Sequence, residues 1–155
     1  MNENQMFSTF DLNNNCLNNY SQIWDGSAWI NSYNFNYSFD ANNNRTLILY
    51  QLWDSVSWVN NYQVISVYDS SNNQIGRFGQ TWQGSWENWF YTSNVFDSIN
   101  NITSSISQNW NGASWVNSSQ YFNTYDTASN LISYRDEWWN GMDEWFPTPI
   151  YLQFE

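Results

Sequence analysis

The chain has 155 residues, a formal net charge of -11 and three cationic side chains, all of them arginine. Nucleic acids and anionic membrane surfaces require clustered cations, so this composition excludes them as partners and favours a neutral or cationic one. With a single cysteine, Cys16, and no histidine, neither an internal disulfide nor a Cys/His zinc site can form.

The N-terminal stretch MNENQMFSTFD has neither a basic segment nor an apolar run, which predicts no signal peptide and no membrane insertion. We therefore expect either a cytoplasmic chain or one that was cut from a longer exported protein. Residues 1–10 are predicted to be a partial first strand, because Phe10-Asp11 matches the aromatic-Asp pair that closes each later unit.

A sequence repeat of 28 to 29 residues runs through the chain and predicts a repeat architecture. It is marked by an aspartate at Asp11, Asp40, Asp69, Asp97 and Asp126, and by a tryptophan at Trp24, Trp53, Trp82, Trp110 and Trp139. We expect one β-repeat domain over residues 1–155, with repeats at 11–39, 40–68, 69–96, 97–125 and 126–155.

Each repeat begins with a polar cluster after the aspartate, as in DANNN from Asp40. Aspartate at the first position and asparagine near the fourth favour a type I turn closed by a left-handed residue. A strand of about nine residues rich in β-branched and aromatic side chains follows, as from Asn44 to Trp53.

A second turn joins this strand to a longer one and usually contains glycine, as in Asp25-Gly26. Its length varies between repeats, which is typical of a loop. The tryptophans at its two edges are predicted to pair across the strands.

The longer strand runs for eleven residues to the next aspartate. Strict alternation in the first copy predicts that one face of the strand carries Trp29, Asn31, Tyr33, Phe35, Tyr37 and Phe39. At the C-terminus, Pro147 and Pro149 suggest an edge or irregular strand, since proline cannot donate to a central ladder.

These elements predict an all-β fold of one partial strand and five strand pairs, the last ending at Glu155. Eleven antiparallel strands close on themselves only through one parallel pairing, because the first and last strands point the same way. We therefore favour an open, twisted antiparallel meander, or one curled into two layers, with a closed up-and-down barrel as the alternative.

The copies WDGSAWINSYNFNYSFDANNN and NWNGASWVNSSQYFNTYDTASNLIS resemble the Trp/Tyr-Asp repeats of exported Bacteroidota proteins. The segment around Tyr125-Asp126 also resembles the YD repeat of Rhs-type proteins. The resemblance covers essentially the whole chain and implies a secreted or cell-surface β-repeat. Where such repeats commonly carry glycine, this chain has Asn14, Asn43, Asn72, Asn100 and Ser129.

Glycan binding is the ligand hypothesis that the repeats favour, because aromatic faces stack on sugars and amides bond hydroxyl groups. The candidate residues are Trp24, Trp29, Asn31, Trp53, Trp58, Asn60, Trp82, Trp86, Asn88, Trp110, Trp115 and Asn117. The alternative is structural: the tryptophans pack in the core or clasp neighbouring strands, and the amides, with the row of Gln22, Gln51, Gln80 and Gln108, form ladders.

Other chemistry has weaker support. Calcium could use Asp40, Asn42 and Asn44, but this turn lacks a closing acidic ligand and otherwise reads as a capped turn. The adjacent pairs Asp136/Glu137 and Asp143/Glu144 are poorly placed for a glycosidase, since neighbours in a strand point to opposite faces. We therefore expect no cofactor and a non-enzymatic adhesive module, with a self-assembling or filament-forming protein as the alternative and a glycan-active enzyme as the least favoured.

Overall fold

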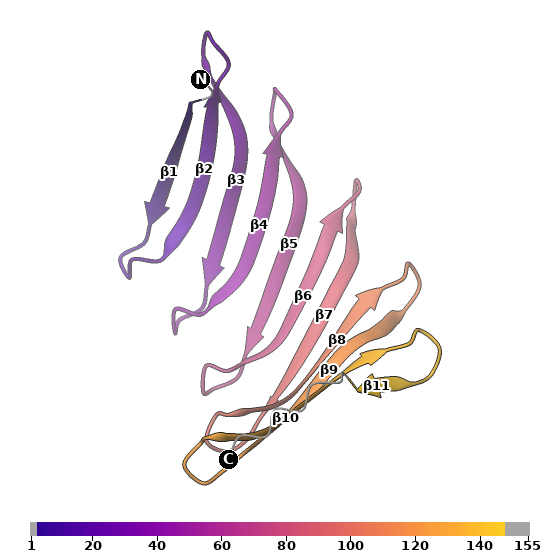
Figure 1. Cartoon of the computed structure of the whole chain (residues 1–155). Coiled ribbons are helices and arrows are strands. Elements are labelled where there is room, and N and C mark those ends of the chain that lie inside the picture. The colour runs from indigo at the N-terminus through magenta and orange to yellow at the C-terminus, as the bar shows by residue number, and fades with distance from the viewer. Residues whose placement is uncertain (1–2, 148–155) are drawn as a thin grey trace. The chain divides into compact units, whose positions relative to one another are not determined.

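The computed structural model describes residues 3–147, in which eleven β-strands and no helix are found (Figure 1). The strands are β1 (Asn4–Phe10), β2 (Cys16–Trp24), β3 (Trp29–Phe39), β4 (Arg45–Trp53), β5 (Trp58–Tyr68), β6 (Gln74–Trp82), β7 (Trp86–Phe96), β8 (Ile102–Trp110), β9 (Trp115–Tyr125), β10 (Leu131–Trp139) and β11 (Trp145–Pro147). Their order in the sheet is their order in the chain, from β1 at one end to β11 at the other.

The predicted all-β antiparallel meander is confirmed, and the sheet is open. Among the described strands, β1 and β11 are not neighbours, so the closed up-and-down barrel kept as the alternative is not the arrangement that forms. The chain divides into two compact units, a first unit of Met1–Ser66 and Gly79–Glu87 and a second of Val67–Phe78 and Asn88–Glu155.

The aspartate turns adopt the predicted geometry. After β1, the Asn14 N–H donates to the Asp11 carbonyl oxygen over 3.1 Å, and Asn14 has a left-handed φ of 64°. The Asp11 carboxylate accepts from the Asn15 side chain at 2.9 Å and from the backbone N–H groups of Asn13 and Asn15 at 2.9 and 2.8 Å. These bonds, led by the Asn15 amide, lower the pKa of Asp11 because they stabilise its charged form.

The same turn recurs in every repeat. The left-handed residues are Asn43, Asn72, Asn100 and Ser129, with φ of 65°, 66°, 67° and 64°. They lie in the turns capped by Asp40, Asp69, Asp97 and Asp126, and the pKa of each of these carboxyls is also lowered by hydrogen bonds. Asparagine tolerates this conformation better than most side chains, which explains its use where glycine would otherwise be expected.

The second turn of each repeat also needs a residue with positive φ. Glycine supplies it at Gly26, Gly84, Gly112 and Gly141, with φ between 86° and 103°. In the second repeat this position is held by Ser55, with a φ of 85°. A side chain at such an angle is strained, and Ser55 is therefore a local weak point of the fold.

The tryptophans at the edges of these turns pair as predicted. Each pair packs edge to face, with ring centroids 5.0 to 5.5 Å apart and interplanar angles of 62° to 70°. The pairs are Trp24 with Trp29, Trp53 with Trp58, Trp82 with Trp86, Trp110 with Trp115, and Trp139 with Trp145. This is a favoured geometry for aromatic pairs, so each pair clasps the open end of a hairpin.

A β-bulge in the long strand overturns the predicted assignment of side chains to faces. In β3, Asn31 lies opposite Gln22 of β2, but Tyr33 lies opposite Ser21, so Ser32 is an extra residue without a partner of its own. The extra residue shifts the alternation of side chains by one position. The register shifts in the same way in β5 and β9.

The prediction that Trp29, Asn31, Tyr33, Phe35, Tyr37 and Phe39 share one face is therefore wrong. Asn31 instead shares its face with Asn34 and Asn36. Asn31 is bonded to Gln22, the other two are bonded to Asn18, and Asn18 and Gln22 lie on the same face of β2. In the first unit, the amide face is the side that carries Gln22, Asn31, Asn34 and Gln51, and the aromatic face is the side that carries Tyr33, Phe35, Tyr50 and Tyr62.

The aromatic face of the first unit contains a run of ring contacts across β3, β4 and β5. Phe35 and Tyr50 lie 4.7 Å apart, and Tyr50 and Tyr62 lie 5.0 Å apart, measured between ring centroids. Among residues 3–147, Val64, on the same face, is the one large apolar residue that is buried, with 4% of its surface exposed. Burial is therefore shared among many half-exposed cross-strand contacts and is not concentrated in a closed core.

The second unit uses similar contacts. The ring of Trp115 lies 5.9 Å from that of Phe78 and 6.1 Å from that of Tyr91. The Arg135 guanidinium lies 4.7 Å above the ring of Phe122, a cation–π geometry. At the end of this unit, β11 is a short strand that ends at Pro147, whereas Pro149 and the predicted strand end at Glu155 lie outside the described residues.

Candidate ligand-binding site

The predicted glycan-binding tryptophans lie in the hairpin clasps. The eight tryptophans form four edge-to-face pairs, each across a turn, so part of each ring surface is covered by its partner. The clasps account for why these residues repeat, in agreement with the structural alternative. Trp58 differs from the other seven because it also lines a hollow in the first unit, where its ring can contact a ligand.

The predicted asparagine row takes part in hydrogen bonds between side-chain amides. Asn31 accepts through Oδ1 from Gln22 at 2.8 Å, and Gln22 accepts in turn from Gln5 at 2.7 Å. The same glutamine-to-asparagine bond joins Gln51 to Asn60 and Gln108 to Asn117, both at 2.9 Å. Asn88 follows Trp86 at the equivalent place in β7.

A second branch of this network links β2 with β3 and β4. The Asn18 amide donates to the Oδ1 atoms of Asn34 at 2.6 Å and Asn36 at 2.9 Å. Both of these asparagines donate onward to Gln51, which donates to Asn60. Asn34 is only 7% exposed and is hydrogen-bonded on both sides, to Asn18 and to Gln51. These two bonds fix the orientation of its amide.

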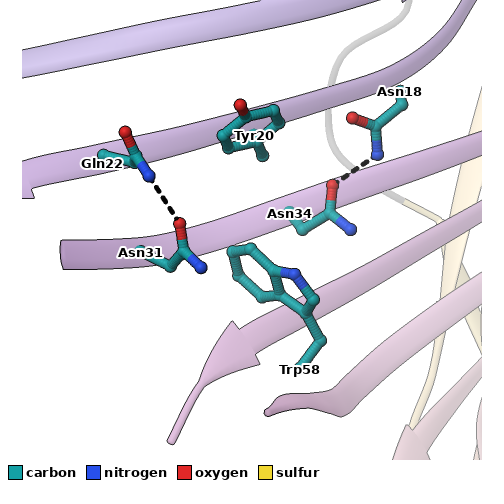
Figure 2. Close-up of a pocket in the computed structure, with 6 residues that line it drawn as sticks. All are labelled: Asn18, Tyr20, Gln22, Asn31, Asn34 and Trp58. Atoms are coloured by element: carbon teal, nitrogen blue, oxygen red, sulfur yellow. Dashed lines mark hydrogen bonds between the residues drawn. The ribbon is translucent and has the colours of Figure 1, made fainter. Parts of the chain in front are cut away.

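The two branches border a hollow of about 300 Å³ on the amide face of the first unit. It is lined by Asn18, Tyr20, Gln22, Asn31, Asn34 and Trp58. Figure 2 shows Tyr20 between the two bonded amide pairs, Gln22 with Asn31 on one side and Asn18 with Asn34 on the other, and Trp58 beside Asn31 and Asn34. This volume is at the lower limit for small-molecule sites, which run from roughly 300 Å³ upward.

Several polar atoms at this hollow remain available to a ligand. The Nδ2 group of Asn31 and the Tyr20 hydroxyl form no hydrogen bond with any residue in the range 3–147, and the Oδ1 atom of Asn18 accepts none there. The ring of Tyr20 is supported from β1 by Phe7, with stacked rings 4.9 Å apart. The hollow thus offers a donor, an acceptor and a hydroxyl around two aromatic side chains.

Sequence reasoning found Asn31 and Trp58 but missed Asn18, Tyr20 and Asn34. Strict alternation placed Asn34 on the face opposite to Asn31, and the bulge at Ser32 reverses that. The unequal lengths of the strands were the available signal, because β3 has eleven residues and β2 has nine.

The weak calcium candidates belong to a capped turn. The Asp40 carboxylate accepts from the backbone N–H groups of Asn42 and Asn44, both at 2.9 Å, and from the Asn44 side-chain amide at 3.0 Å. Asn44 therefore directs a donor, not an oxygen ligand, toward Asp40. Within residues 3–147, no group of three or more His, Cys, Asp or Glu side chains is placed to hold a metal ion.

None of the four paired carboxylates is among the residues that line the hollow in the first unit. Asp136 lies opposite Tyr121 and Glu137 opposite Gln120, which places the two acids on opposite faces of β10. Glu137 accepts from Gln120 and lies 3.4 Å from Arg135. Asp143 and Glu144 are exposed in the turn that follows β10.

No protein-family model matches the chain, and no curated protein matches it. Among solved structures, it is similar to a DUF3836 family protein from Parabacteroides distasonis, with 14% identity, a TM-score of 0.44, and coverage of 54% of this chain and 78% of that one. A DUF3836 family protein from Bacteroides vulgatus gives 19% identity, a TM-score of 0.41, and coverage of 64% and 87%. A protein with unknown function from Bacteroides fragilis gives 11% identity, a TM-score of 0.42, and coverage of 99% of this chain and 93% of that one.

Within residues 3–147, no helix is long and apolar enough to cross a bilayer.

Proposed function

We propose that this chain is a non-enzymatic, secreted or cell-surface β-repeat module that binds a neutral glycan in the hollow on its amide face. The observation that carries the proposal is the lining of that hollow, in which Tyr20 and Trp58 adjoin the unpaired Nδ2 group of Asn31. Sugars present both apolar C–H faces and hydroxyl groups, and aromatic rings and amides match these two kinds of surface.

The charge of the protein supports a neutral ligand. The net charge is -11, and no arginine lines the hollow. An acidic polysaccharide would meet long-range repulsion without a local cation to offset it. Uncharged hydroxyl groups, by contrast, are well served by amide side chains, which both donate and accept.

The lining also supports binding without chemistry. Glycoside hydrolysis usually requires two carboxyl groups flanking the scissile bond. The residues that line the hollow are asparagine, glutamine, tyrosine and tryptophan, with no aspartate or glutamate among them. We therefore propose that a bound glycan is held and not cleaved.

The test is a glycan panel monitored by intrinsic tryptophan fluorescence, followed by a matched pair of variants. Asn31→Ala removes the unpaired amide donor from the hollow, whereas Asn117→Ala removes the equivalent amide in the second unit, where it lines neither hollow. We expect Asn31→Ala to weaken binding about tenfold, the effect of losing one good hydrogen bond, and Asn117→Ala to leave it unchanged.

Equal losses in the two variants would show that the amide network acts only through stability, and would refute the site. A panel without any saturable response from the folded protein would refute glycan binding altogether. Reducing ends released from a bound polysaccharide would refute the non-enzymatic part of the proposal.

The proposed location at the cell surface is based on the resemblance to exported Bacteroidota repeats. Its test is labelling of intact cells of the source organism with an antibody against the chain. Labelling of intact cells supports the proposal, and labelling only after the cells are permeabilised contradicts it.

Self-association is the second candidate function, and a row of exposed apolar side chains favours it. Ile23 lies opposite Ile30, and Leu52 lies opposite Val59, with 37% to 41% of each side chain exposed. These residues lie on the aromatic face of the first unit, where a second copy could cover them. Sedimentation velocity should then show a concentration-dependent series that Leu52→Gln abolishes; a monomer at all concentrations contradicts this function.

A further inference from the structure

The second unit has a hollow of its own, of about 210 Å³. It is lined by Ser93, Val95, Ser104, Ser105, Ile106, Gln120 and Phe122. They come from β7, β8 and β9.

This hollow overlaps with the place of the first one in the repeat at three positions, where Ser104, Ile106 and Gln120 correspond to Asn18, Tyr20 and Asn34. Beyond these positions the first hollow extends to Trp58 of β5, and the second to Ser93 and Val95 of β7. In the first unit, Asn18 pairs with Asn36 and Tyr20 pairs with Asn34 between β2 and β3. Between β8 and β9, Ser104 pairs with Phe122 and Ile106 pairs with Gln120, at corresponding positions relative to the bulge and the tryptophan clasp. The bulged hairpin therefore makes a hollow at this point in both units, and the side chains decide what each one accepts.

Two of the three shared positions are less polar in the second hollow, and the third keeps an amide, with Gln120 in place of Asn34. The amide of Asn18 is replaced by the small hydroxyl of Ser104, and the phenol of Tyr20 by the aliphatic chain of Ile106. Phe122 also lines the second hollow, whereas the corresponding Asn36 does not line the first, and the Arg135 guanidinium lies 4.7 Å from the centroid of the Phe122 ring.

Two of the four polar side chains in the lining are committed. Ser105 is hydrogen-bonded to Tyr121 and Gln120 donates to Glu137, whereas Ser93 and Ser104 form no side-chain hydrogen bond with any residue between 3 and 147. Two free hydroxyl groups thus lie beside the apolar side chains of Val95 and Ile106.

We propose that the hollow in the second unit binds a 6-deoxy sugar, a hexose in which a methyl group stands in place of the hydroxymethyl group. The inference rests on the proposed function, that hollows of this repeat accept saccharides. The methyl group packs against Val95 and Ile106, and the free hydroxyls of Ser93 and Ser104 bond to ring hydroxyl groups. An ordinary hexose brings its exocyclic hydroxyl against Val95 and Ile106, which offer no hydrogen bond, while the neighbouring Ser93 and Ser104 hydroxyls are already bonded to ring hydroxyl groups, and this costs affinity.

The experiment is an NMR titration of the full-length, ¹⁵N-labelled chain with matched sugars. The probes are the methyl glycosides of D-galactose, D-glucose and D-mannose and of their three 6-deoxy counterparts, which differ from them by a single hydroxyl group. At the backbone amides of Ser104 and Ile106, we expect at least one 6-deoxy sugar to bind about tenfold more tightly than its parent hexose, the effect of one unpaired hydroxyl. At Asn18 and Tyr20 we expect the parent hexose to bind at least as tightly.

The two hollows are read separately, so the two proposals fail separately. Shifts at Asn18 and Tyr20 without shifts at Ser104 and Ile106 would overturn this inference and retain the proposed function. Shifts at Ser104 and Ile106 without a preference for any 6-deoxy sugar would also overturn it. Shifts there with that preference, but none at Asn18 and Tyr20, would retain the second hollow and refute the first.

A residue exchange gives an independent test. The double variant Ser104→Asn with Ile106→Tyr installs the side chains that the first unit has at these positions. We expect the preference for the 6-deoxy sugar at this hollow to disappear, while the response of Asn18 and Tyr20 stays constant as an internal control. A preference that survives the exchange would overturn the inference, and if the variant does not fold, the comparison of matched sugars on the unmodified chain decides alone.

Discussion

Replacing Ser55 with glycine is expected to stabilise the protein, because Ser55 holds a backbone conformation that favours glycine. Its φ is 85°, close to the 86° of Gly84 and Gly141 in the equivalent turns. The Asp54 carboxylate caps this turn through the N–H groups of Val56 and Ser57, at 2.9 and 2.7 Å. Neither cap involves the Ser55 side chain, so the substitution should leave both bonds in place.

The expected magnitude follows from two opposing effects. A non-glycine residue in the left-handed region costs about 1 to 2 kcal/mol. Relief of this strain is offset by about 0.5 to 1 kcal/mol in the glycine variant, because glycine loses more conformational entropy on folding than serine does. The net gain for Ser55→Gly is then about 1 kcal/mol, or a rise in melting temperature of about 2 to 4 °C for a chain of this size.

The reverse substitution, Gly26→Ser, is the matched control. A Cβ atom added at Gly26, where φ is 103°, meets no atom within 4 Å, so its cost is conformational and involves no steric clash. We expect a loss of about 1 kcal/mol, measured for both variants by urea unfolding followed by tryptophan fluorescence. A Ser55→Gly variant no more stable than the parent, beside a destabilised Gly26→Ser, would show that the Ser55 turn is not strained.

Three further predictions concern the caps, the clasps and the core. Stability should fall as the solution is acidified below about pH 4, because the folded-state pKa of the turn aspartates lies below the unfolded value of about 3.9; their contribution is present above that value and is lost as the pH falls through the folded pKa. Urea midpoints across pH should show a smaller acid loss in Asp40→Asn, and an identical profile would contradict this. A double-mutant cycle on Trp53 and Trp58, whose rings are 5.1 Å apart, should give a coupling of about 0.5 to 1.5 kcal/mol; additive losses would exclude the clasp. Val64→Ala should lower the free energy of unfolding by about 2 kcal/mol, because Val64 is buried. Val67→Ala, at a site 52% exposed, should lower it by less than about 0.5 kcal/mol. Equal losses in equilibrium unfolding would contradict the difference in burial.

The local structure of this protein was predictable from its sequence. The capped turn at Asp11 involves residues within four positions of one another, and the facing of Trp24 and Trp29 follows from the short turn between them. Such contacts need no knowledge of the rest of the chain. The repeat then carries the same turns and clasps to every unit, and the parity of the strand count favoured an open sheet.

The distribution of side chains between the two faces was decided only by tertiary structure. Alternation is read along one strand, but the extra residue at Ser32 becomes visible only when β3 is aligned with β2. One inserted residue reverses the face of every side chain after it, so Asn34 joins Asn31 and Tyr33 leaves it.

The candidate site depends on the same register. Its lining brings together Tyr20 from β2, Asn31 and Asn34 from β3, and Trp58 from β5. The sequence by itself determined the period, the turns and the tryptophan pairs, because these arise from contacts between near neighbours. The pairing of strands decided which amides share a face with which rings, because that arrangement is set by hydrogen bonds between strands and leaves no mark in the alternation of any single one.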